Sequence, residues 1–158
     1  MKPYIVAITG ASGIIYGVRL VEALVEAGVA VELVVSDTAK IVMKEESRGL
    51  APFLAEKGPG PLIHRHDFHD FTAPIASGSY HVEGMVVIPC SMGTLGAIAS
   101  GLSQNLIHRA ADCTIKEGRK LILVPRETPL SAIHLENMLK LSRLGVRIVP
   151  AMPAVYSG

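Results

Sequence analysis

Long apolar runs are missing from this sequence, although 49% of its 158 residues are hydrophobic and its mean hydropathy is +0.41. No run approaches the roughly 18 to 20 residues that a membrane-spanning helix needs. We therefore expect no membrane insertion and assign the apolar excess to a buried sheet or a subunit interface. The short apolar stretch after Met1 and Lys2 reaches a glycine turn too early to be a signal peptide.

Net charge and cysteine are also scarce. The sequence has 15 Lys and Arg against 14 Asp and Glu, and the net charge of +1 predicts neither a nucleic-acid nor a membrane surface. Cys90 and Cys113 are isolated, so neither a disulfide framework nor a zinc site is indicated. We expect a single domain, residues 1–158, that works in a reducing cytoplasm.

A glycine turn near the N-terminus is the strongest local signal. The β-branched run Ile5–Ile8 predicts a buried parallel strand, and an amphipathic helix follows the turn. This arrangement presents free backbone N–H groups to an anion, usually a phosphate. The spacing of Gly10, Gly13 and Gly17 is not the G-x-G-x-x-G dinucleotide fingerprint, and no tyrosine has a lysine four residues later. A nucleotide-like phosphate site is therefore favoured over a nicotinamide site.

Further strands and helices are expected in alternation. The strands are Val29–Val35, Met85–Pro89, Lys120–Pro125 and Val146–Val149, and the helices are Thr38–Glu46, Thr94–Ser100, Asn105–Lys116 and Ile133–Leu144. This order predicts an α/β fold, a Rossmann-like, mainly parallel sheet with helices on both faces. Because the carboxyl ends of parallel strands meet at one edge, Ser36 and the turn Cys90–Gly96 should share a crevice with Ser12. Two such turns favour a nucleotide or flavin site.

Potential metal ligands are concentrated in His64-Arg65-His66-Asp67-Phe68-His69-Asp70. They lack the i, i+4 spacing of ligands on one helix face, and no second cluster completes a coordination shell. We therefore expect a polar surface loop without a metal. The small-residue segment Ala73–Ser79 that follows could lie against a planar ligand or a neighbouring subunit.

Two groups of charged residues have different interpretations. Arg109, Asp112 and Lys116 share a helix face, where charge pairs on a solvated surface explain them without a function. Arg126 and Glu127 follow the strand Lys120–Pro125, and packing does not require a charged pair there. Arginine can bind phosphate bidentately and glutamate can transfer a proton, so a functional role is favoured for this second group.

Six motifs occur in order along the chain: GASG at 10–13, APIASG at 73–78, PCSMGTL at 89–95, RAAD at 109–112, PRETPL at 125–130 and PAMPAVY at 150–156. Together they closely resemble the UbiX family of flavin prenyltransferases, formerly described as 3-polyprenyl-4-hydroxybenzoate or phenylacrylate decarboxylases. The resemblance implies transfer of the dimethylallyl group of dimethylallyl monophosphate to N5 and then C6 of reduced FMN, without a metal. It also implies a homo-oligomer, typically a dodecamer with FMN at subunit contacts, and a UbiD-type decarboxylase that receives the prenylated FMN.

The resemblance also assigns site residues. The FMN contacts would be Ala11, Ser12, Gly13, Ser36, Ser91, Met92, Gly93, Thr94 and Arg126. The residues around dimethylallyl phosphate would be Arg109, Lys116, Arg126 and Tyr156. Glu127 would be the acid–base residue, with Ser12 near the flavin N5 and Glu46 assisting. Family members continue through a further helix with another phosphate-binding arginine, which has no counterpart in this sequence.

Three alternatives remain open at this point. An FMN-dependent cysteine decarboxylase of the same superfamily would carry a Pro-x-Met-Asn motif, where this sequence has Pro-Arg-Glu-Thr-Pro at 125–129. A flavin-binding subunit without catalysis would follow if the additional arginine is indispensable. A nicotinamide oxidoreductase comes last because of the glycine spacing.

Overall fold

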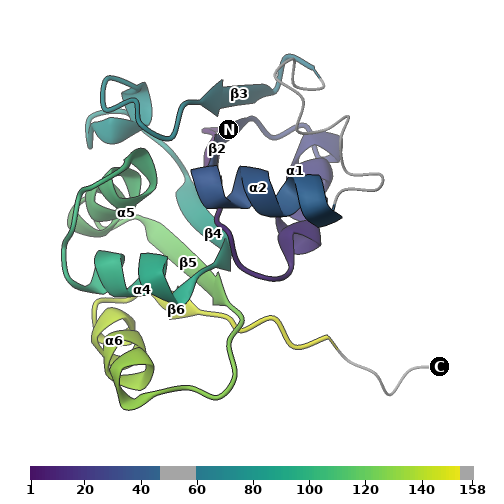
Figure 1. Ribbon diagram of the computed structural model, residues 1–158. Coiled ribbons are helices and arrows are strands. Elements are labelled where there is room, and N and C mark those ends of the chain that lie inside the picture. Colours follow the sequence, from purple (N-terminus) through teal and green to yellow (C-terminus); the bar gives the residue numbers. More distant parts are fainter. Residues whose placement is uncertain (47–59, 154–158) are drawn as a thin grey trace.

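The computed structural model describes residues 1–46 and 60–153, which form a six-stranded sheet with helices on both faces (Figure 1). The strands are β1 (Tyr4–Ile8), β2 (Val31–Val35), β3 (Ile63–His66), β4 (Gly84–Cys90), β5 (Lys120–Pro125) and β6 (Arg147–Ile148). The helices are α1 (Ile14–Glu26), α2 (Asp37–Glu46), α4 (Met92–Ala99), α5 (Leu106–Lys116) and α6 (Ala132–Arg143), with a short 3-10 helix η1 (Pro74–Ala76). The order is β3-β2-β1-β4-β5-β6, and every pairing is parallel. The Rossmann-like α/β fold is confirmed.

Helices α1 and α2 cover one face of the sheet, and α4, α5 and α6 cover the other (Figure 1). A hydrophobic core lies on each face of the sheet, and strand β1 contributes side chains to both. Its Val6 and Ile8 pack with α1 and α2, whereas Ile5 and Ala7 belong to the core under the other three helices. Successive side chains of a strand point to opposite faces, so a strand covered on both faces reads as a continuous apolar run.

The stretch Ile63–His66 corrects one expectation, because it is strand β3 and not part of a surface loop. It pairs in parallel with β2 at the edge of the sheet, where His64 is in register with Glu32. A strand at the edge has one strand neighbour, and in β3 His64 is exposed while the other three side chains are only partly buried. The apolar pattern that marks the central strands is therefore absent. The stretch Asp67–Asp70 does lie outside the strands and helices, and the described residues contain no group of three or more possible metal ligands.

The growth of the sheet changes direction between β1 and β4. From β1 the sheet extends through β2 to β3, and from β4 it extends the other way through β5 to β6. Ligands of open α/β sheets bind outside the carboxyl ends of the strands at such a switch point. Gly17 lets α1 pack closely here, since a Cβ at this position would overlap the Ile88 carbonyl oxygen. The start of α1 is thereby held beside the end of β4.

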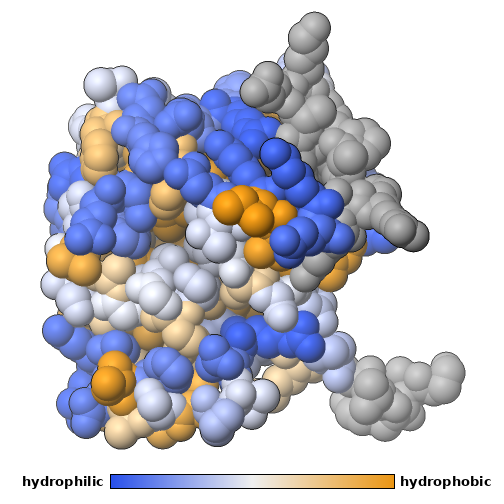
Figure 2. All heavy atoms as spheres, in the orientation of Figure 1, coloured by the Kyte–Doolittle hydropathy of each residue, from blue (hydrophilic) through white to orange (hydrophobic). Residues whose placement is uncertain are grey.

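The outer faces of α2 and α6 carry exposed apolar side chains. Ile41 on α2 is 60% exposed, and an apolar spot stands out on this helix in Figure 2. On α6, Ile133, Leu135 and Leu139 are each more than half exposed. Within residues 1–46 and 60–153, no helix has the length and apolar character needed to cross a membrane. These apolar side chains are available for contacts with other protein surfaces.

Candidate active site

Thr9 joins the turn after β1 to the turn after β4. Its hydroxyl donates to the Pro89 carbonyl at 2.7 Å and accepts from the Ser91 N–H at 2.8 Å. Thr9 is only 2% exposed, so its hydroxyl is buried. The two turns were expected to meet, and the structure brings them together. Thr9 was not singled out from the sequence, where only its place at the start of the glycine turn marked it.

The turn after β1 leaves the start of α1 open to a ligand. Gly13 is the N-cap, with φ of 99°, and no side chain caps the helix. This left-handed conformation favours glycine. The first N–H groups of a helix have no partner within the helix, and with the helix dipole they attract an anion. Ala11 and Ser12 lie in the same turn.

The turn after β4 is built differently, because its N-cap is a side chain. The Ser91 hydroxyl accepts from the Thr94 N–H at 3.2 Å and donates to the Thr94 hydroxyl at 2.9 Å. A Cβ at Gly93 would meet nothing within 4 Å, so the space beside the first turn of α4 is open. Met92 begins this helix. The predicted FMN contacts at 91–94 therefore form an accessible helix start.

Ser36 lies at the same edge, but its hydroxyl has a structural partner. The Ser36 Oγ accepts from the Ala39 N–H at 3.0 Å and so caps the start of α2. Its own N–H donates to the Ile8 carbonyl at 3.0 Å, which ties the end of β2 to the end of β1. Ser36 is 7% exposed. Its position agrees with the prediction, whereas its side chain is already used for capping.

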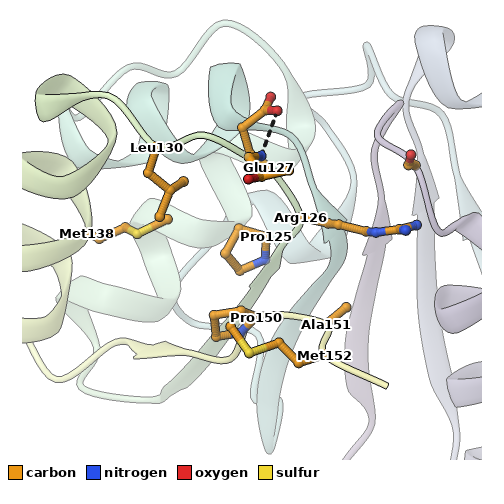
Figure 3. A pocket seen from close by; sticks show the side chains of 10 residues that line it. Pro125, Arg126, Glu127, Leu130, Met138, Pro150, Ala151 and Met152 are labelled. Carbon is orange, nitrogen blue, oxygen red and sulfur yellow. Dashed lines mark hydrogen bonds between the residues drawn. The ribbon is translucent and has the colours of Figure 1, made fainter. Parts of the chain in front are cut away.

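A cavity of about 450 Å³ opens beside these turns (Figure 3). It is lined by Ser12, Pro125, Arg126, Glu127, Thr128, Leu130, Met138, Pro150, Ala151 and Met152. Three predicted site residues, Ser12, Arg126 and Glu127, thus come together from the ends of β1 and β5. The Arg126 side chain extends toward the β1–α1 turn (Figure 3), and the Glu127 carboxylate accepts from the Thr128 N–H at 3.0 Å.

The lining of the cavity combines three kinds of chemistry. Arg126 is a cation able to hold a phosphate through two N–H groups. Glu127 can give or take a proton. Leu130, Met138 and Met152 form an apolar side that suits a hydrocarbon group. The volume falls in the range of roughly 300 to 1,000 Å³ that is usual for small-molecule sites. The cavity therefore suits a ligand in which a phosphate is joined to a short hydrocarbon.

Arg109 and Lys116 lie elsewhere, on α5, and neither is among the described residues that line this cavity. The Arg109 Nε donates to the Ala76 carbonyl at 2.9 Å, and its guanidinium is 3.6 Å from Asp112. The Lys116 ammonium is 2.6 Å from the Glu117 carboxylate. That hydrogen bond raises the pKa of Lys116 above its ordinary value, because it stabilises the charged form. The sequence could not show that these cations lie apart from Arg126.

Two predicted residues are not described. Tyr156 lies outside the described residues, and Glu46 is described only by its backbone position at the end of α2.

The fold and the cavity define a flavoprotein, and the comparisons with known proteins agree. The model of the Flavoprotein family matches residues 1–156. The flavin prenyltransferase UbiX of Alkalihalophilus pseudofirmus is 54% identical over 158 residues, covering 96% of this chain and 78% of that protein. The flavin prenyltransferase UbiX of Methanothermobacter thermautotrophicus is 49% identical over 156 residues, covering 99% and 80%. The chain therefore belongs to the Flavoprotein family and, within it, to the UbiX flavin prenyltransferases.

Solved structures support this placement. AnUbiX in complex with FMN and dimethylallyl pyrophosphate is 43% identical, with a TM-score of 0.86 over 97% of this chain and 79% of that one. The dodecameric FMN-dependent UbiX-like decarboxylase from Escherichia coli O157:H7 is 50% identical, with a TM-score of 0.89 over 98% and 82%. The cysteine decarboxylase TvaF is 20% identical with a TM-score of 0.70, so it shares the fold alone.

Proposed function

We propose that this protein is a flavin prenyltransferase, which joins the dimethylallyl group of dimethylallyl monophosphate to N5 and C6 of reduced FMN. The observation that carries the proposal is the cavity in which Ser12 of the glycine turn meets Arg126 and Glu127 beside an apolar wall. Arg126 suits the phosphate, Glu127 suits proton transfer, and the apolar wall suits the C5 hydrocarbon. The UbiX relatives, including one solved with FMN and dimethylallyl pyrophosphate, support the same assignment.

The residues at this edge of the sheet fit FMN. Helices α1 and α4 both begin here, no side chain caps the start of α1, and the space beside Gly93 in the first turn of α4 is open. The residues that would hold FMN are Ala11, Ser12, Gly13, Ser91, Met92, Gly93, Thr94 and Arg126, with Ser36 supporting the edge through its cap of α2. Reduced FMN, when bound, supplies the electron-rich nitrogen and carbon that accept the prenyl group.

The side chains of the cavity have complementary roles in the transfer. Arg126 binds the phosphate of the donor and neutralises the charge that grows as the carbon–oxygen bond breaks. Glu127 moves a proton between the flavin and the departing phosphate. The apolar wall of Leu130, Met138 and Met152 packs the C5 group. Overall, one C5H8 unit is added to reduced FMN and phosphoric acid is released.

Arg109 and Lys116 would act in the cavity of another copy of the chain. They do not line the cavity of their own copy within the described residues, although the family resemblance places them around the same donor. A UbiX-like relative is dodecameric, and the exposed apolar side chains of α2 and α6 offer contact surface. The proposed assembly is therefore a homo-oligomer, with Glu46 and Tyr156 completing the site.

The product and the compartment follow from the same assignment. Prenylated FMN would pass to a UbiD-type decarboxylase. Cys90 and Cys113 are buried free thiols, which agrees with a reducing cytoplasm.

Anaerobic incubation with FMN, dithionite and dimethylallyl monophosphate, followed by mass spectrometry of the released flavin, tests the proposal. We expect the flavin mass to rise by one C5H8 unit, and the Glu127→Gln variant to slow this reaction strongly while still binding FMN. Bound FMN without a mass gain would refute the prenyltransferase and leave a flavin-binding subunit. Release of CO2 from a peptidyl or pantothenoyl cysteine would favour the cysteine decarboxylase.

A further inference from the structure

The segment 74–80, which comprises η1 and the four residues after it, lies against both cationic residues of α5. The Ala76 carbonyl accepts from the Arg109 Nε at 2.9 Å. Gly78 packs so closely against the end of α5 that a Cβ there would lie 2.6 Å from the Lys116 ammonium nitrogen. Segment 74–80 therefore restricts the positions of both the Arg109 and the Lys116 side chains.

The side chains of Glu32 and Arg119, which lie outside α5, anchor this segment. The Tyr80 hydroxyl donates to the carboxylate of Glu32 in strand β2. The Arg119 guanidinium donates to the Gly78 carbonyl at 2.7 Å and to the Tyr80 carbonyl at 3.0 Å. Segment 74–80 is thus fixed to the sheet on one side and to the start of β5 on the other.

Glu32 is a buried carboxylate, with a side chain only 3% exposed. Besides Tyr80, it has His66 Nε2 at 2.6 Å and His64 Nδ1 at 3.5 Å. A buried charge is tolerated only when it is paired and hydrogen-bonded. The hydrogen bond to Glu32 also raises the pKa of Tyr80 to about 12, so Tyr80 remains a donor throughout the physiological range. None of these four residues lines the cavity, so the mechanism above does not use them.

We infer that Tyr80 and Glu32 are positioning residues for the reaction. They hold segment 74–80 against Arg109 and Lys116. In this way they set the orientation in which these two cations bind the donor phosphate. The inference rests on the proposed function, in which Arg109 and Lys116 contact dimethylallyl monophosphate. A guanidinium fixed at Nε by a carbonyl keeps its two terminal NH2 groups in a defined plane, which is the geometry that bidentate phosphate binding requires. A more mobile segment 74–80 would no longer fix the orientation of the Arg109 guanidinium, although its positive charge would remain.

The test compares Tyr80→Phe with the matched control Tyr4→Phe in the full chain loaded with oxidised FMN, which cannot turn over. Tyr4 has no hydrogen bond from its hydroxyl among the described residues. We expect Tyr80→Phe to raise the Kd of dimethylallyl monophosphate by about 3- to 10-fold, on the order of one hydrogen bond. Tyr4→Phe should change it by less than about twofold. In turnover with reduced FMN, KM should rise by a similar factor with little change in kcat.

A double-mutant cycle separates positioning from a general loss of stability. In an Arg109→Met background, Tyr80→Phe should have almost no further effect on the Kd, because the residue that it positions is gone. Glu32→Gln, which keeps an acceptor for the Tyr80 hydroxyl, should raise the Kd less than Tyr80→Phe does. It also provides a second variant if Tyr80→Phe folds poorly.

The outcomes distinguish this inference from the proposed function. Prenyl transfer by the wild type with an unchanged Kd in Tyr80→Phe, or an equal loss in both Arg109 backgrounds, would overturn the positioning role alone. The expected Kd pattern without any prenyl transfer would support the positioning role and overturn the proposed function. A wild type that does not bind dimethylallyl monophosphate at all would overturn both.

Discussion

Ser91 donates its backbone N–H to the hydroxyl of Thr9 at 2.8 Å, across 82 positions of sequence. The same hydroxyl donates to the Pro89 carbonyl. One side chain thus joins the ends of β1 and β4 at the switch point of the sheet, where the FMN site is proposed. The Thr9 backbone N–H also donates to the Pro89 carbonyl, at 3.2 Å. We expect the spacing of the two helix starts that would hold FMN to depend on the added side-chain bonds.

Replacing Thr9 by valine tests that dependence. Valine keeps the shape but leaves the Ser91 N–H without its acceptor, whereas the Pro89 carbonyl keeps the Thr9 backbone N–H at 3.2 Å. Each unsatisfied buried group costs about 1–3 kcal/mol, so we expect a lower free energy of unfolding and weaker FMN binding. Chemical denaturation and flavin fluorescence titration measure the two effects. Thr9→Ser, which keeps the hydroxyl, should retain most of the FMN affinity, and equal losses in both variants would argue against the hydrogen bonds.

Gly17 and Gly96 form a matched pair of helical glycines. A Cβ at Gly17 would overlap the Ile88 carbonyl oxygen, which belongs to the backbone and cannot move aside. Gly17→Ala should therefore destabilise the protein by about 1–3 kcal/mol through overpacking. A Cβ at Gly96 would meet only the Asn137 amide nitrogen at 3.5 Å, an ordinary contact. Gly96→Ala should be neutral or stabilising by up to about 1 kcal/mol, and denaturant midpoints of the two variants decide the comparison.

Much of this fold could be predicted from the sequence because its central strands are covered on both faces. Such strands leave continuous apolar runs, as in Ile5–Ile8, and glycine turns mark their ends. Strand β3 was missed because His64 and His66 are polar, and their partner Glu32 lies in another strand. Pairing between residues more than thirty positions apart leaves no local pattern. The glycine turn, in contrast, was predicted from the local sequence alone.

In the candidate site, too, some features could be predicted from the sequence and others depend on tertiary packing. Ser12, Arg126 and Glu127 were assigned to one site by the family resemblance, and the structure brings them together because each follows a strand of a parallel sheet. Ser36 was placed at the correct edge, but the capping role of its hydroxyl depends on where α2 begins. The hydrogen bond from Arg109 to Ala76 could not be inferred, because it depends on how η1 packs on α5.

The buried carboxylate of Glu32 should make stability depend on pH. Burial alone would raise the pKa of this carboxyl, but the hydrogen bonds from His66 and Tyr80 outweigh it and lower the pKa below the ordinary value of 4.5. The folded state then binds fewer protons in acid than the unfolded state. The contribution to stability is present above pH 4.5 and is lost as the pH falls through the lower, folded-state pKa.

Comparison with Glu32→Gln makes this pH dependence measurable. The free energy of unfolding of the wild type should exceed that of the variant most above pH 4.5, and the difference should shrink toward lower pH. Urea denaturation of both proteins at a series of pH values provides the measurement. A difference that stays constant across the acid range would mean that the Glu32 charge contributes nothing to it.

Mixed oligomers test whether Arg109 and Glu127 of one working site come from different copies. The Arg109→Met and Glu127→Gln variants should each be nearly inactive as pure proteins. When they are co-expressed in equal amounts, a site that draws these two residues from different copies is intact in about one quarter of cases, if the chains assemble at random. Prenyl transfer should therefore recover to about that fraction of the wild-type rate. If both residues served the site of their own copy, every site would contain a defect and no activity would return.

The matched control for this experiment is the pair Arg126→Met and Glu127→Gln. Both residues line the cavity of a single copy, so no mixture of these two variants can build an intact site. Activity that returns with the first pair and not with the second assigns Arg109 to the neighbouring copy. If activity returned with both pairs, the recovery could not come from sites shared between copies, and the experiment would not support the assignment of Arg109 to a neighbouring copy. No recovery with either pair would place Arg109 in its own copy's site, which would require α5 to approach the cavity more closely than in this structure.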